Sequence, residues 1–243
     1  ISIVCACKSD MSRKPADEDF VTVLEQASQT QSKLSQKVIR VFFSSPFGGL
    51  ELEREELTKK YWPQLQTLCG HHGYTFVPVD LRWGITSDLS ANASTIKICL
   101  SEIDRSNIFV GFFGQRYGWH GEDKLLQKTF DVAQHDYPWL AEHRGKAVTE
   151  LEFLHGHLRN PGRIPACFYF RDKAYDDKMF AQYEAEGNER EMRKYRSITD
   201  GPYAAELLDD LKKSVYETRD KVNISQRLKI CQDNNLIYQS NAL

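Results

Sequence analysis

The chain has 243 residues, of which 41% are hydrophobic, and its 32 basic and 34 acidic residues leave a formal net charge of −2. This length fits one large α/β domain, or one domain with appended segments, and the interleaved charges disfavour a nucleic acid or an anionic membrane as partner. No apolar run approaches the roughly 20 residues that cross a bilayer, and the six scattered cysteines form neither a disulfide framework nor a zinc ligand set. We therefore expect a cytoplasmic protein with reduced thiols that binds no membrane, nucleic acid or metal.

The first part of the chain is predicted to be a polar arm followed by a strand and a helix. Residues 1–36 are mostly polar, and we interpret them as an N-terminal arm or linker. The segment "KVIRVFFSS" is β-branched and aromatic over the length of a strand and ends at turn residues, which predicts a buried first strand. Residues 50–69 open with "ELEREE" and continue with apolar positions at helical spacing, which predicts a helix.

The rest of the chain alternates between strand and helix patterns. Strands are predicted at "YTFVPVDL", "NIFVGFFG", "PACFYF" and, as a fifth candidate, "NNLIYQS". Helices are predicted at 94–106, around Glu150 and at about 201–219, with a charged insertion at about 173–200. This alternation predicts an α/β domain over 37–243, with a parallel sheet covered by helices on both faces.

The ligand site of such a sheet is expected beyond the carboxyl ends of its strands. The segments "SSPFGG", "DLRWGITS" and "GQRYGWHG" would meet there, close to the loop that leads into Glu150. Phe47, Trp83 and Trp119 lie in these loops and suit a flat ligand such as a nucleobase, although loops that pack on one another would explain them equally well. Asp80 ends the second strand, where it can meet ribose hydroxyls or form a structural ion pair with an arginine such as Arg82.

Glu150 and Glu152 lie in the first turn of the helix predicted at "VTELEFLHG". Helix geometry points their side chains roughly 200° apart around the helix axis. Thr149 and Glu152 fit the spacing of a capping box, which would give Glu152 a structural role. Glu150 would then lie half covered at the border of the apolar stripe, where the helix dipole favours its carboxylate form. Such a carboxylate can stabilise a developing positive charge, or it can simply be a solvated residue of the first turn.

Four strings resemble the Toll/interleukin-1 receptor-like (TIR-like) domain of nephrocystin-3-type proteins over about residues 38–172. They are "RVFFSSPFGGLELEREELTKKYWPQL", "FVPVDLRWGITS", "ICLSEIDRSNIFVGFFGQRYGWHG" and "VTELEFLHG". The resemblance implies a flavodoxin-like TIR fold, with a five-stranded parallel sheet and helices on both faces. It also implies further domains in the same full-length chain, namely a nucleotide-binding region and tetratricopeptide repeats.

Many TIR domains are NAD glycohydrolases, so the resemblance implies cleavage of NAD, as substrate rather than cofactor, to nicotinamide and ADP-ribose or cyclic ADP-ribose. Glu150, followed by Leu151, matches the place of the family's catalytic glutamate, whereas Lys146 stands where a tryptophan is often found. The implied substrate contacts are ring stacking by Trp83 and Trp119, first-loop contacts by Ser44, Ser45 and Phe47, and ribose or phosphate contacts by Asp80 and Arg82.

The alternative is a module without catalysis. Many TIR domains act by self-association, and nephrocystin-type proteins resemble scaffolds. The chain would then form homo-oligomers through TIR–TIR contacts, as part of a larger signalling or ciliary protein.

Overall fold

The computed structural model describes residues 37–81 and 93–218, and the predicted arm and the fifth strand candidate lie outside these ranges. The described residues form one parallel sheet in the order β2-β1-β3-β4. Its strands are β1 (Val38–Ser44), β2 (Thr75–Val79), β3 (Ile108–Phe113) and β4 (Ala166–Phe170). The predicted parallel α/β architecture is therefore confirmed, and it is consistent with a flavodoxin-like fold, but the described sheet has four strands rather than five.

Helical segments connect the strands. Between β1 and β2 lie α2 (Glu51–Glu56), the π-helical turn η2 (Leu57–Tyr61) and α3 (Trp62–His71), and α5 (Thr95–Asp104) precedes β3. Between β3 and β4 lie α6 (Lys124–Gln134), η4 (Pro138–His143), α7 (Val148–Phe153) and η5 (Leu154–Leu158). After β4 come α8 (Lys173–Ala185), α9 (Glu189–Met192), η6 (Arg193–Tyr195), η7 (Ser197–Asp200) and α10 (Ala204–Glu217).

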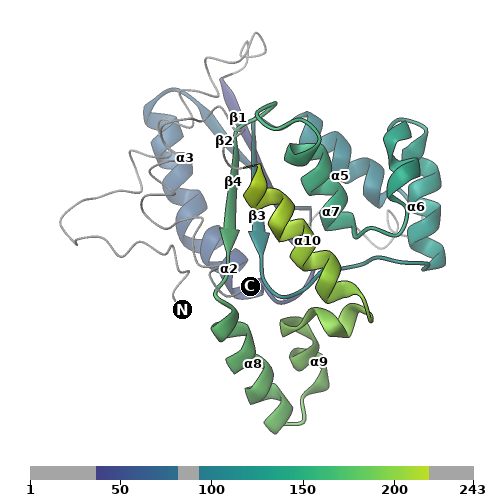
Figure 1. Cartoon of the computed structure of the whole chain (residues 1–243). Coiled ribbons are helices and arrows are strands. Elements are labelled where there is room, and N and C mark those ends of the chain that lie inside the picture. The colour runs from purple at the N-terminus through teal and green to yellow at the C-terminus, as the bar shows by residue number, and fades with distance from the viewer. Residues whose placement is uncertain (1–36, 82–92, 219–243) are drawn as a thin grey trace.

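The sheet is buried on both faces. Val41 and Phe43 of β1 pack with Cys69 of α3 on one face. Phe42 and Phe109 pack on the other face with α5, α7 and α10, which Figure 1 shows on the side of the sheet opposite α3. All six residues of β3 are buried, as expected for the centre of a parallel sheet.

The charged insertion between β4 and α10 is helical and lies beyond the carboxyl ends of β3 and β4 (Figure 1). Its connection begins at Arg171, whose guanidinium pairs with the buried Asp176 of α8 and with Glu53 of α2 at 2.9 Å. Arg171 also donates a hydrogen bond to the backbone oxygen of Gly49. The insertion is therefore fastened to the loop that follows β1.

Candidate functional site

The candidate site lies where the strand order reverses, at the carboxyl ends of β1 and β3. Ser44, the last residue of β1, is in register with Gly111 of β3. The chain leaves β1 toward α2 and α3, whereas α7, which follows β3, covers the opposite face. Parallel sheets bind ligands at this kind of switch point.

Six side chains meet there and form what we call the edge cluster: Ser44, Ser45, Arg54, Asp80, Cys99 and Glu152. They come from the end of β1, from α2, from the residue after β2, from α5 and from α7. Ser44, Ser45 and Asp80 were predicted site residues, and the structure brings all three together. Arg54, Cys99 and Glu152 were not predicted as site residues.

Glu152 is the acid at the centre of the edge cluster. Its carboxylate accepts a hydrogen bond from Ser44 Oγ at 2.5 Å and another from the thiol of Cys99, and the residue is 8% exposed. Burial raises the pKa of Glu152 to about 7, against the opposing effects of both hydrogen bonds and of the Arg54 charge. Near neutral pH this carboxyl group therefore exists in both protonation states.

Arg54 and Asp80 form an ion pair next to Glu152, and both side chains are only 3% exposed. Arg54 Nε also donates to Ser45 Oγ at 3.0 Å. Burying these charges is costly unless they pair with one another. The contacts of Arg54 with Asp80 and Ser45 therefore hold the ends of β1 and β2 against α2. The edge cluster thus holds two carboxyl groups and one guanidinium at the carboxyl edge of the sheet.

Glu150 faces a different set of partners. Its carboxylate accepts from Tyr117 Oη and pairs with Lys146 Nζ at 2.5 Å, and the residue is 6% exposed. Burial and the neighbouring Glu150 charge raise the pKa of the Tyr117 phenol, so Tyr117 is the hydrogen donor of this pair. The expectation that Glu150 is only half covered is wrong, because it is buried where it joins the loop after β3 to the start of α7.

The predicted capping box is also wrong. Helix α7 begins at Val148, its N-cap is Ala147 in an extended conformation, and no side chain caps it. Thr149 is therefore already inside the helix. Glu152 contacts Ser44 of β1 instead of its own helix start.

The predicted aromatic residues lie in different surroundings. Phe47 is 51% exposed on the loop after β1, whereas Trp119 is partly buried and packs against the core on the α7 side of the sheet. Arg82 and Trp83 lie outside the described residues. Only Phe47 is thus clearly available to a ligand among the predicted aromatic residues that the structure describes.

Asp200 of η7 orders the loop that carries Tyr117. Its carboxylate accepts from the backbone N–H groups of Tyr117 at 3.0 Å and Gly118 at 3.1 Å, and it pairs with the guanidinium of Arg116. No sequence pattern indicates this contact, because Asp200 is one acid among many in the insertion.

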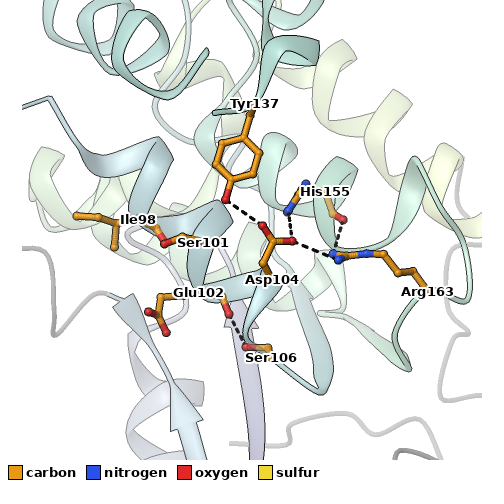
Figure 2. A network of polar contacts seen from close by, with 8 residues as sticks. All are labelled: Ile98, Ser101, Glu102, Asp104, Ser106, Tyr137, His155 and Arg163. Atoms are coloured by element: carbon orange, nitrogen blue, oxygen red, sulfur yellow. Dashed lines mark hydrogen bonds and ion pairs between the residues drawn. The ribbon is translucent and has the colours of Figure 1, made fainter. Parts of the chain in front are cut away.

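A separate polar network lies on α5 (Figure 2). Asp104 accepts from Tyr137 Oη at 2.9 Å and pairs with His155 Nε2 at 2.8 Å and Arg163 Nη1 at 3.2 Å. These bonds tie the end of α5 to η5 and to the residues around η4 and β4. We interpret the network as structural.

No group of three or more His, Cys, Asp or Glu side chains in residues 37–81 and 93–218 could hold a metal ion. Within the same residues, no helix has the length and apolar character to span a membrane.

Sequence comparisons relate the chain to parts of much larger proteins. It is 32% identical over 203 residues to a TPR repeat-containing protein of Dictyostelium discoideum, covering 81% of this chain and 12% of that protein. It is 34% identical over 139 residues to telomerase protein component 1 of Mus musculus, covering 55% of this chain and 5% of that protein. It is 41% identical over 95 residues to NACHT domain- and WD repeat-containing protein 1 of Homo sapiens, covering 37% of this chain and 6% of that protein.

The chain therefore spans a small fraction of each of these relatives. Their names give the resemblance to TIR-like domains of nephrocystin-type proteins no direct support, and no solved structure matches the chain. A family model described as "Domain of unknown function (DUF4062)" matches residues 40–223, which is most of the sequence. The chain belongs to this family of domains of unknown function.

Proposed function

We propose that the domain cleaves the nicotinamide–ribose bond of NAD and that Glu152 is the carboxylate beside the reacting ribose. The observation that carries the proposal is the burial of Glu152 next to the Arg54–Asp80 pair at the switch point of the sheet. The choice of NAD rests on the sequence resemblance to TIR-like domains. Glu150, which the resemblance places at the catalytic position, is instead proposed to hold the loop after β3.

The chemistry requires a negative group that is already in place. The bond from ribose C1′ to the nicotinamide nitrogen breaks, its electron pair leaves with the neutral nicotinamide, and the ribose becomes an oxocarbenium ion. A carboxylate next to that ion stabilises the developing charge. Water then adds to C1′ and releases a proton to give ADP-ribose, or the adenine of the same molecule attacks to give cyclic ADP-ribose.

The proposed roles of the other residues follow from their positions. Ser44 donates to Glu152 and orients it, so it acts as a positioning residue. Asp80 and Ser45 lie beside Arg54 and are proposed to meet the ribose and the phosphates. Phe47 is proposed to contact a ring of the substrate from the exposed loop, and Trp119, Trp83 and Arg82 stay as predicted contacts.

The decisive experiment compares two matched substitutions on the same helix. Glu152→Gln removes the charge at nearly constant size, so nicotinamide release from NAD should fall by on the order of a hundredfold or more. Glu150→Gln should keep turnover per folded molecule within about tenfold of the parent, because the charge that it removes is not the one proposed to face the ribose. Circular dichroism would give the folded fraction of each variant.

The pH profile provides a second readout in the same experiment. The reaction needs the Glu152 anion, whose pKa lies at about 7, so kcat/KM should rise from pH 6 to pH 8 and then level off. Full activity in Glu152→Gln would reject the assigned carboxylate. No nicotinamide from the parent at any protein concentration would reject NAD cleavage.

The second candidate is an interaction module without catalysis. The observation that favours it is that the matched relatives carry this region as 5% to 12% of longer chains named for TPR repeats, NACHT domains or telomerase. Such a module should self-associate without cleaving NAD. Light scattering and nicotinamide release over a hundredfold dilution series separate the two candidates, and specific activity that rises with concentration would indicate an oligomeric enzyme.

A further inference from the structure

The carboxylate of Asp200 lies among hydrogen-bond donors that are arranged to hold an anion. Its Oδ2 accepts from Arg116 Nε at 2.8 Å and from the backbone N–H groups of Tyr117 at 3.0 Å and Gly118 at 3.1 Å. Its Oδ1 pairs with the guanidinium of Arg116. We call these three donor residues the anion cradle. A guanidinium fork beside two successive backbone N–H groups suits a phosphate as well as a carboxylate.

The anion cradle lies at the edge of the sheet where parallel sheets bind their ligands. Arg116 is the third residue after the end of β3. A Cβ at Gly118 would lie 3.5 Å from Pro46, in the loop after β1, and 3.6 Å from Thr149 Oγ1 of α7. The cradle therefore adjoins the loop and the helix that border the edge cluster.

The segment that brings Asp200 into the cradle is weakly anchored. Ile198 is the only apolar residue of η7 and is 69% exposed, so η7 buries little apolar surface. Gly201 directly follows Asp200 with a φ of +144°, which places a glycine hinge beside the carboxylate. Segments with few buried apolar contacts open at a low free energy. Asp200 can thus leave the cradle while Arg171 keeps the start of the insertion fastened to α2.

We propose that the anion cradle binds the diphosphate of a nucleotide and that Asp200 is an internal competitor for this site. Phosphate oxygens would take the place of the Asp200 carboxylate and accept the same hydrogen bonds from Arg116 and the two N–H groups. The cradle already holds a negative charge at contact distance, so the exchange replaces one anion by another. The space for the ligand is the space that the carboxylate leaves when η7 moves away.

Phe47 favours a nucleotide over a free phosphate ion. A Cβ at Gly48 would lie 3.3 Å from Arg116 Nη1, so the residue after Phe47 contacts the cradle. Phe47 itself is 51% exposed and offers a ring on which a base can stack. Glu51 also lies near Gly48, but it is paired with Lys194 at 3.3 Å. The inference does not rest on NAD cleavage, because any nucleoside diphosphate carries the groups that it requires.

The test measures the binding of ADP to the full chain by isothermal titration calorimetry. ADP has no nicotinamide bond, so the result is independent of the proposed reaction. Asp200→Ala removes the competitor, and the dissociation constant should fall at least tenfold because the open cradle becomes the main state. Asp210→Ala removes an exposed acid of α10 and should leave the constant within twofold of the parent. If Asp200→Ala gained no more affinity than Asp210→Ala, the proposal would be overturned.

Asp200→Asn keeps the test decisive if Asp200→Ala does not fold. It retains an oxygen for the two N–H groups but gives up the charge that holds Arg116, so ADP should bind several-fold more tightly than to the parent. Circular dichroism gives the folded fraction of each variant. Unchanged affinity in a folded Asp200→Asn protein would show that Asp200 only orders the loop.

A second pair of variants tests the cradle itself in the Asp200→Asn background. Arg116→Gln removes the guanidinium, so ADP binding should weaken at least tenfold, whereas Arg193→Gln, at a side chain that is 66% exposed, should change it little. An equal loss in both variants would show that affinity follows net charge and would reject the cradle. Inorganic pyrophosphate is the second probe, and binding as tight as that of ADP would reject the nucleotide.

Discussion

Glu150 and Glu152 are separated by two positions on α7, and each is buried against different hydrogen donors. The partners of Glu152 come from β1 and α5, whereas those of Glu150 are Tyr117 in the loop after β3 and Lys146, two residues before the start of α7. A buried carboxylate must be hydrogen-bonded or paired, so each set of donors fixes the use of one glutamate. The helix therefore has one acid for the edge cluster and one for the loop.

The first prediction concerns the structural role of Glu150. Glu150→Gln removes the charge partner of Lys146 and weakens the bond from Tyr117, so it should lower the free energy of unfolding by about 1–3 kcal/mol. Lys146 is partly exposed and can turn to solvent, which limits the loss. Urea unfolding followed by circular dichroism measures the difference.

Glu55→Gln is the matched control for this prediction. It removes the same kind of charge from an i,i+4 pair with Lys59 in which both side chains are more than half exposed. Exposed pairs of this kind contribute about 0.5 kcal/mol or less. If the two variants unfolded at the same urea concentration, the Glu150 pair would be no more than a surface contact.

The capping box shows why local spacing assigned the wrong contacts to Glu152. The spacing of Thr149 and Glu152 fits the motif, but the loop after β3 supplies the contacts at the helix start. The N–H of Val148 donates to Trp119 O at 3.2 Å and that of Ala147 to Tyr117 Oη at 3.3 Å. Tertiary contacts therefore set the start of α7, and local spacing cannot reveal them.

At the scale of elements, α7 and η5 approach the sheet so closely that glycine is needed on both sides. A Cβ at Gly111 of β3 would lie 2.4 Å from the ring of Phe153, and one at Gly156 of η5 would lie 2.4 Å from the ring of Phe109. The apolar pattern of β3 correctly predicted a central strand. It could not show that the covering helix lies within van der Waals contact of its backbone.

The second prediction follows from this close packing. Gly156→Ala places a methyl group into the Phe109 ring, so overpacking should lower the free energy of unfolding by about 1–3 kcal/mol. A Cβ at Gly70 in α3 would meet nothing within 4 Å. Gly70→Ala should therefore raise the free energy of unfolding by about 0.5–1 kcal/mol, because alanine is the better helix former. Thermal unfolding of both variants beside the parent shows whether each substitution lowers or raises the stability. A Gly156→Ala protein as stable as the parent would mean that η5 can move away from the sheet.

The insertion between β4 and α10 shows a further limit of sequence reasoning. Its many charges mark it only as a charged insertion, yet Asp176 is fully buried and Lys194 reaches Glu51 at 3.3 Å. The backbone oxygen of Lys194 lies against Gly49, where a Cβ would be only 2.2 Å away. The use of these charges depends on which loops the fold brings opposite them, and composition carries no such information.

At the scale of the whole molecule, the alternation of strand and helix patterns was enough to predict a parallel α/β sheet and the edge at which a site would form. The family resemblance pointed to Ser44 and Ser45, and the end of the predicted second strand pointed to Asp80; all three lie at that edge. Arg54 and Cys99 reach the same edge from helices that also carry ordinary surface and core residues. Their convergence is a property of the folded chain, and so is the difference in partners between Glu150 and Glu152.

The molecule also contains two buried groups, His157 and Glu152, that make its stability change with pH in opposite directions. His157 is 1% exposed, its Nε2 contacts Thr218 Oγ1 at 2.8 Å, and burial lowers its pKa from 6.5 to about 4. Its contribution to stability is therefore fully present above pH 6.5 and is lost as the pH falls toward 4. The pKa of Glu152 is raised from 4.5 to about 7, so its contribution is fully present below pH 4.5 and is lost as the pH rises through 7.

The third prediction is that these two pH dependences largely cancel between about pH 4.5 and 6.5. Replacing either residue should therefore reveal the pH dependence of stability that the other residue causes. Each shift corresponds to roughly 3 kcal/mol, because one pKa unit is about 1.4 kcal/mol. Glu152→Gln should therefore gain up to about 3 kcal/mol relative to the parent as the pH rises from 4.5 to 7.5, whereas His157→Gln should lose stability relative to the parent as the pH rises from 4.5 to 6.5. Urea unfolding at four pH values gives these differences, and the subtraction removes the titrations that all three proteins share. If Glu152→Gln followed the parent at every pH, Glu152 would titrate as an ordinary glutamate, and the pH profile expected for NAD cleavage would lose its physical basis.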